Sequence, residues 1–172
     1  MAIFDRVISL WKSEDLLSQA WEDSFQMMVL SNEMFSAAIR YLRRGEKIKT
    51  LKNLKKRDRE INEFQKSVRK KVVTHFSVSQ KVEDFPSGLV LLNIVVDVER
   101  LGDYTKNILD LAIHYPDPLV SEECLSSLKE IEDNIQSRFA DTLVAIENKM
   151  RNLQKNFSNH TGNHSPISPT KL

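Results

Sequence analysis

Four polar side chains interrupt the apolar stripes of two helix-forming segments, and their types and spacing could bind a cation. Glu99 and Asp103 are four residues apart in one segment, and Asp58 and Asn62 are four residues apart in the other. Residues four apart lie on the same side of an α-helix, where two carboxylates repel each other unless a cation lies between them. On facing helices these side chains would supply oxygen ligands to a hard metal ion, or to iron or zinc with water completing the shell.

Ion pairing is the alternative explanation for these carboxylates. A buried carboxylate without a partner is costly, so it needs a hydrogen-bond donor, a metal ion or a basic side chain. Arg100 and Lys106 follow the acidic residues closely, Asn107 and Asp110 continue the same polar ridge, and a strongly basic segment lies upstream. Spacing alone favours an ion-pair network on the helix surface over a metal site.

The charge of the chain is unevenly distributed. Its 172 residues include 25 Lys and Arg against 24 Asp and Glu, a net charge of +1. Residues 40–71 carry 14 basic and 4 acidic side chains, and the remainder carries 11 and 20. This segment could simply be solvated, or it could meet an acidic protein surface, anionic lipid or nucleic acid. It lacks interleaved aromatic residues and any nucleic-acid recognition motif, so nucleic acid is not expected. The residues expected to dock a protein partner are Arg43, Arg44, Lys47, Lys55 and Lys56.

Familiar catalytic motifs are missing from the sequence. There is no P-loop, no G-x-S-x-G, no H-E-x-x-H and no Glu-x-x-His pair of the di-iron carboxylate type. His75 and His114 fall near predicted helix ends, which is typical of capping or surface histidines, and Cys124 has no activating neighbour. We therefore expect no enzymatic activity.

Glycine and proline divide the chain into long helix-forming stretches. Gly45, Pro86-Ser87-Gly88 and Pro116-Asp117-Pro118 mark the breaks, and apolar residues recur at three- and four-residue steps between them. The predicted helices are residues 14–44, 47–78, 87–115 and 120–156. The third of them is hydrophobic nearly all round over 89–96, which predicts that it is covered on several sides. Short connections favour antiparallel neighbours, so the predicted fold class is all-α, an up-and-down helical bundle.

The two ends of the chain differ from this bundle, which we place at residues 14–157. Residues 1–13 form an apolar, amphipathic segment that could touch a membrane surface or a partner, or pack as a first turn on the bundle. Residues 158–172 are rich in Ser, Asn and Pro and are predicted to be a disordered polar tail. No stretch is long enough to span a bilayer, no signal peptide is evident and the single Cys has no partner, so we expect a cytoplasmic protein.

Two motifs resemble those of the PhoU proteins, a family of phosphate-uptake regulators. Residues 96–108, VDVERLGDYTKNI, are similar to the signature helix of that family, with its carboxylate, Glu-Arg, aliphatic residue, Gly, Asp and downstream Asn-Ile. Residues 58–62, DREIN, resemble the second motif, an Asp followed four residues later by Asp or Asn. The resemblance covers about residues 14–115 and keeps both motifs in the family's order and spacing.

The resemblance implies a three-helix repeat whose carboxylate motifs bind iron, zinc, manganese or magnesium, here through Glu99, Asp103, Asp58 and Asn62. Arg100 and Asn107 would contact these ligands from outside and orient them. The resemblance also implies a non-enzymatic cytoplasmic role in restraining phosphate uptake, through contact with a phosphate transporter subunit or its sensor kinase. The fourth predicted helix is extra, and its apolar seam supports a homodimer, which a full metal cluster would need. A metal-free structural adaptor with a basic docking surface is the alternative.

Overall fold

The computed structural model describes residues 16–44, 48–79, 81–114 and 122–161, and all of its regular structure there is helical. The predicted N-terminal segment, residues 1–13, lies outside this part of the chain. In chain order the elements are α2 (Leu16–Arg44), α3 (Ile48–Lys56), α4 (Asp58–Val78), the short 3₁₀ helix η1 (Val82–Asp84), α5 (Phe85–His114) and α6 (Glu122–Thr161).

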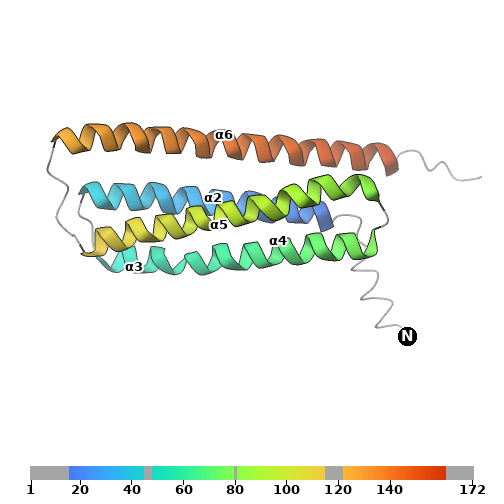
Figure 1. Cartoon of the computed structure of the whole chain (residues 1–172), viewed down its shortest axis with the longest axis horizontal. Coiled ribbons are helices and arrows are strands. Elements are labelled where there is room, and N and C mark those ends of the chain that lie inside the picture. The colour runs from blue at the N-terminus through green and yellow to red at the C-terminus, as the bar shows by residue number, and fades with distance from the viewer. Residues whose placement is uncertain (1–15, 45–47, 80, 115–121, 162–172) are drawn as a thin grey trace, which may run out of the picture.

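The long helices alternate in direction, as Figure 1 shows. α2, α4 and α5 pack against one another as a three-helix bundle, and α3 leads into α4 at the end of the bundle where α2 finishes. α6 runs along the outside of α2. The all-α, up-and-down architecture predicted from the sequence is therefore confirmed.

The most covered helix is α2, because α4, α5 and α6 all pack on it. Two polar residues, Ser24 and Ser31, are fully buried in it. Their hydroxyl groups donate to the carbonyls of Ala20 and Met27, at 2.8 and 2.9 Å. Such bonds to the preceding turn satisfy a serine inside a helix, so polar residues can face the core at little cost.

The third predicted helix is α5, and it is covered on several sides, as its sequence predicts. It packs mainly on α2 and α4, and also meets α3 and η1. Leu89 and Val90 near its start remain 54% and 49% exposed. An apolar sequence predicts burial, but only the position of a helix in the bundle decides how many of its sides are covered.

The second predicted helix, residues 47–78, is two helices that meet at Arg57. The amide of Arg57 donates to the carbonyl of Leu54 at 3.0 Å, and the amide of Glu60 donates to the carbonyl of Arg57 at 2.9 Å. Hydrogen bonds between residues three apart form a tighter turn than the α-helix does. Charges match both helix ends, since Lys55 and Lys56 close α3 while acidic side chains open α4. Neither Gly nor Pro marks the break, so the sequence reading missed it.

The residues Pro86-Ser87-Gly88, which mark a break in the sequence, lie in the first turn of α5, so this helix begins two residues earlier than predicted. Proline is tolerated there because the first amides of a helix have no partner within it. Gly88 lies against the ring of Phe76, and a Cβ at this position would approach the Cζ atom of that ring to 2.3 Å. The same ring stacks on Phe85, with centroids 4.4 Å apart. A side chain at position 88 would therefore force the ring of Phe76 to move.

α6 uses one narrow stripe to pack on α2. Its buried side chains among the described residues, Glu132, Phe139 and Ile146, recur every seven residues. Phe139 meets Phe35 of α2 with ring centroids 5.6 Å apart. The helix continues to Thr161, beyond the predicted end at residue 156 and into the predicted tail. No helix in the described part of the chain is long and apolar enough to cross a membrane.

Candidate functional site

The two sequence motifs lie on neighbouring helices, at a point where the helices approach each other closely. Gly102 of α5 is buried against Ile61 of α4. A Cβ atom on Gly102 would lie 2.8 Å from the Cδ1 atom of Ile61, which is closer than two carbon atoms pack. Each of these residues sits inside one of the motifs. The missing side chain of the glycine therefore lets the two motifs meet.

A lysine lies between the carboxylates of the two motifs. The Nζ atom of Lys106 is 2.7 Å from Oδ1 of Asp103 on its own helix and 3.3 Å from Oδ2 of Asp58 on α4. The side chain of Asp58 is 16% exposed, compared with 49% for Asp103 and 30% for Lys106. One ammonium group therefore bridges two carboxylates across the interface between α4 and α5. This confirms ion pairing with Lys106, one of the partners considered for the acidic residues.

The environment of Lys106 stabilises its charged form. Hydrogen bonding to Asp103 raises the pKa of Lys106 above its usual value of 10.5, and the hydrogen bond and charge of Asp58 act in the same direction. Partial burial opposes this shift because it disfavours any charge, but it is the weaker effect. The lysine is thus a firmly held cation.

A second lysine extends this ionic contact toward the end of the bundle. Lys55 of α3 forms an ion pair with Asp110 of α5, and both side chains are partly exposed. Asp110 lies four residues after Lys106, and Lys55 lies three residues before Asp58, so the two bridges follow one another along the same seam. The polar ridge of α5 thus pairs with α3 and α4 through alternating charges.

The other predicted ligands are not part of this cluster. Glu99 and Asn62 are half-buried, and neither makes a hydrogen bond or ion pair within the described residues. Arg100 contacts Asp97 on the exposed side of α5, at 3.2 Å, and Asn107 is exposed. The expectation that Arg100 and Asn107 orient the carboxylates has no support in these contacts. Successive helix residues are about 100° apart, which turns Arg100 away from its neighbour Glu99.

These residues do not fit a metal ion as they stand. Within the described ranges, no three His, Cys, Asp or Glu side chains come together in a way that could hold one. The two carboxylates that do converge share the ammonium group of Lys106, which a metal ion would have to displace. Metal binding by Glu99, Asp103, Asp58 and Asn62 therefore stays a prediction.

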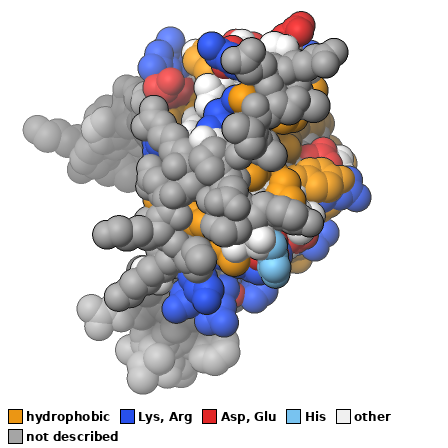
Figure 2. Space-filling view, turned by 90° about the vertical axis from the view of Figure 1, so that its left-hand side faces the viewer, with side chains coloured by type: hydrophobic (Ala, Val, Ile, Leu, Met, Phe, Trp, Pro, Cys, Tyr) orange, Lys and Arg blue, Asp and Glu red, His pale blue; other side chains and the backbone are white. Residues whose placement is uncertain are grey.

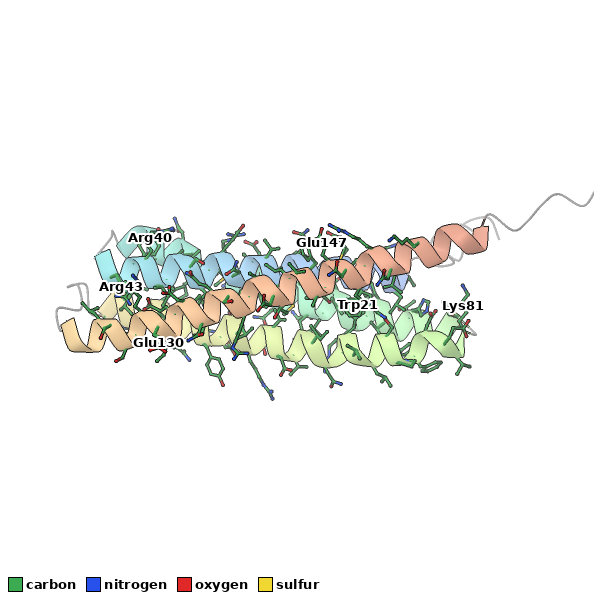
Figure 3. The ribbon with its side chains drawn as sticks, turned by 90° about the horizontal axis from the view of Figure 1, so that it is seen from above. Trp21, Arg40, Arg43, Lys81, Glu130 and Glu147 are labelled. Carbon is green, nitrogen blue, oxygen red and sulfur yellow. The ribbon has the colours of Figure 1, made fainter. Side chains whose placement is uncertain are left out.

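The predicted docking residues divide into two groups. Arg43 donates from Nε and from a terminal nitrogen to the same carboxylate oxygen of Glu132 on α6, at 2.9 and 2.7 Å, and Lys55 is engaged with Asp110. Both therefore hold the bundle together. Lys56 is exposed, while Lys47 and the side chain of Arg44 lie outside the described part. Figure 3 shows Arg43 beside the first part of α6.

Glu132 is the residue that the sequence reading missed. Its side chain is only 11% exposed, and it occupies a core position of the α6 stripe. The signal was a carboxylate one heptad before Phe139, at a position where an apolar residue belongs. A buried carboxylate in that position requires a basic partner on the facing helix, which is Arg43.

The two histidines considered in the sequence have structural contacts. His75 is buried near the end of α4, and its Nε2 atom lies 2.8 Å from Oδ2 of Asp84 in η1. His114 is exposed in the last turn of α5, where its Nδ1 atom lies 2.7 Å from the carbonyl oxygen of Asp110. Both histidines form polar contacts at helix ends, as their positions in the sequence suggested. Cys124 lies where side chains are not described.

Comparison with known families identifies the bundle. A family model of the PhoU domain matches residues 25–112, which cover most of α2 and α5 and all of α3 and α4. Both carboxylate motifs fall inside this range, and α6 falls outside it. No curated protein and no solved structure matches the chain.

Proposed function

Because the chain belongs to the PhoU family, whose members are associated with the regulation of phosphate uptake, we propose that it regulates phosphate uptake by binding another protein. One observation carries this proposal. The family match covers the three-helix bundle of α2, α4 and α5, in which the two family motifs face each other. Family members are regulatory proteins, so the proposal is for a non-enzymatic, cytoplasmic protein. Hydrolysis of phosphate esters by the purified chain would contradict it.

The surface proposed for docking lies on α3 and α4. Its basic side chains are exposed and form no ion pair with any described residue: Lys52, Lys56, Arg59, Arg69 and Lys70. Figure 2 looks onto the end of the bundle that carries α3 and shows Lys and Arg side chains along its lower edge. Unpaired exposed cations attract an acidic partner surface and raise the rate of association. The partner proposed is a phosphate transporter subunit or its sensor kinase.

Charge reversal tests this docking surface. The double variant Lys52→Glu/Lys56→Glu should lose co-purification with the transporter subunit or the kinase from cells grown in phosphate-rich medium. The matched control is Lys129→Glu/Lys149→Glu, which reverses two exposed lysines on α6. Retention of the partner by the first variant, or equal loss in both, would contradict the proposal.

A homodimer is the second part of the proposal. α6 packs on α2 through one stripe and leaves Leu128, Ile131 and Val144 exposed by 37%, 55% and 55%. Exposed apolar side chains on this helix support association with another copy, because burying them releases ordered water. Sedimentation of the full chain should give a dimer, and Ile131→Glu/Val144→Glu should give a monomer. A monomeric wild-type chain would contradict this part.

The alternative function, a metal-free helical adaptor, is favoured by one observation. The acidic ridge of α5 pairs with basic residues of the chain itself, through Lys55 and Lys106. Loss of the transporter or kinase contact under all growth conditions, with an intact dimer, would support the adaptor over the regulator.

A further inference from the structure

We propose that Lys106 is the permanent cation of the motif site: its ammonium group takes the position between Asp58 and Asp103 where a metal ion would bind, so the fold of this chain needs no metal there. The inference goes beyond the proposed regulatory function and does not depend on which partner the chain binds. It explains why motifs typical of a metal-binding family meet on facing helices while no three potential metal ligands come together among the residues that the structure describes.

The distances are those of a shared cation. The contact to Asp103, at 2.7 Å, is a short charge-assisted hydrogen bond, and the contact to Asp58, at 3.3 Å, is a longer one. A lysine has three N–H donors, so one ammonium group can serve both carboxylates at once. The two carboxylates come from different helices, as the ligands of a bridging metal ion would.

The position of Lys106 in the chain favours it over a free ion. It lies three residues after Asp103 on the same helix, so the two side chains are neighbours whenever α5 forms. A tethered group meets its site at an effective concentration in the range of about millimolar, which a free divalent ion must exceed or outbind. Ordering the lysine side chain also costs less than dehydrating a small divalent ion such as Mg²⁺.

The side chains next to this site would offer a metal ion few charged ligands. Asn62 offers a neutral oxygen at the position where the motif pattern also allows a carboxylate, and Glu99 forms no hydrogen bond or ion pair with any described residue. With the lysine in place, a metal ion would gain few charged ligands and would leave the ammonium group without a partner. Removing the lysine reverses this balance, because two carboxylates then face each other without any cation.

The test compares three forms of the full-length chain: wild type, Lys106→Met and the matched control Lys55→Met. The control removes a lysine that bridges α3 and α5 but pairs with one carboxylate only. Each protein is treated with EDTA, dialysed against Mn²⁺ or Zn²⁺, and examined by elemental analysis and thermal unfolding. Both readouts are independent of any biological activity.

We expect wild type to retain no stoichiometric metal and to show a change in Tm of less than about 1 °C between EDTA and metal. Lys106→Met should have a lower Tm than wild type in EDTA, bind about one metal ion per chain and recover several degrees of Tm, because a ligand that binds only the folded state stabilises it. Lys55→Met should not respond to metal.

Two results would overturn the proposal. One is a wild-type chain that retains metal and loses Tm in EDTA. The other is a Lys106→Met variant that folds and yet responds to metal no more than wild type does. If Lys106→Met fails to fold, Lys106→Gln replaces it, because its amide can still donate to one carboxylate. The wild-type measurements test the proposal even if neither variant folds. A failure of the proposed docking interaction would not change any of these results.

Discussion

Two helix interfaces of this protein contain charged groups, and they use them differently. Between α4 and α5, the ammonium group of Lys106 is shared by Asp58 and Asp103 at a partly exposed seam. Between α2 and α6, the guanidinium group of Arg43 serves the single carboxylate of Glu132, which is nearly buried. The first interface is within the matched PhoU domain, and the second joins that domain to the helix outside the match.

The difference teaches how strongly each interface depends on its ions. A buried carboxylate that loses its partner has no water to replace it, so the α2–α6 contact depends heavily on one arginine. At the α4–α5 seam, water reaches part of every charged group, and the close contact between Gly102 and Ile61 holds the helices together independently. Four changes would break or sharpen this contrast, and they follow from the largest expected effect to the smallest.

Arg43→Met should have the largest effect, because it leaves Glu132 nearly buried without a basic partner. We expect the free energy of unfolding to fall by about 2–3 kcal/mol, somewhat less than for a fully buried pair. Chemical denaturation measures the change. Arg151→Met is the control, since it removes an exposed pair with Glu147 on the same helix and should cost no more than about 0.5 kcal/mol. Equal losses in the two variants would show that the burial of Glu132 is unimportant.

Gly102→Val should destabilise the α4–α5 contact through overpacking, since even a Cβ would lie 2.8 Å from Ile61 Cδ1. The expected loss in the free energy of unfolding is about 1–2 kcal/mol. Asn93→Val is the control at an exposed position of α5, with an expected change within about 0.5 kcal/mol. If Gly102→Val is as stable as the control, the helices have room to move apart and the close approach is not required.

Asp58→Asn should cost about 1 kcal/mol, because Lys106 loses its partner on α4 but keeps Asp103. Asp58 also lies in the first turn of α4, where the helix dipole favours a negative charge. Glu60→Gln is therefore the matched control, because Glu60 shares that first turn but does not contact Lys106. If Asp58→Asn loses no more free energy of unfolding than Glu60→Gln, the ionic bridge does not stabilise the α4–α5 contact.

The pH dependence should give the smallest effect. Hydrogen bonding to Asp103 and Asp58 raises the pKa of Lys106, so the folded protein holds this proton more tightly than the unfolded chain. Its contribution to stability is complete below the unfolded pKa of about 10.5 and is lost as the pH rises through the higher pKa of the folded state. At neutral pH, wild type should exceed Lys106→Met in free energy of unfolding by no more than about 1 kcal/mol. This difference should disappear as the pH is raised above the pKa of the folded state. A stability difference between the two proteins that stays constant across this range would contradict the bridge.

Much of the fold could be read from the sequence, and the exceptions have local causes. Periodicity and the positions of Gly and Pro indicated four helical segments and their antiparallel order. The break at Arg57 was missed because it consists of backbone hydrogen bonds between residues three apart, and neither glycine nor proline marks it. The start of α5 at Phe85, two residues before the predicted start, was missed because proline usually indicates a break, although it also suits the start of a helix.

The candidate site was predicted in part. The spacing of Asp58 and Asp103 within their motifs placed both on inward helix faces, and Lys106 was among the partners considered. Arg43 was expected on an outer surface, but it is a partner of Glu132, a contact between residues far apart in the chain. Sequence spacing identifies neighbours along one helix, and it carries little information about which side chain a separate helix brings opposite.

The sequence by itself determined the all-α class, the family motifs and the concentration of basic residues in 40–71, because these depend only on residue type and helical period. Only the tertiary structure decided which cations of that segment are free and which are bound within the bundle. It also placed Lys106 between the two motifs and made α2 the most covered helix. The reason is physical: a side chain's partner across an interface is fixed by how closely and at what register two helices pack. Here Gly102 lies directly against Ile61, in one such close contact.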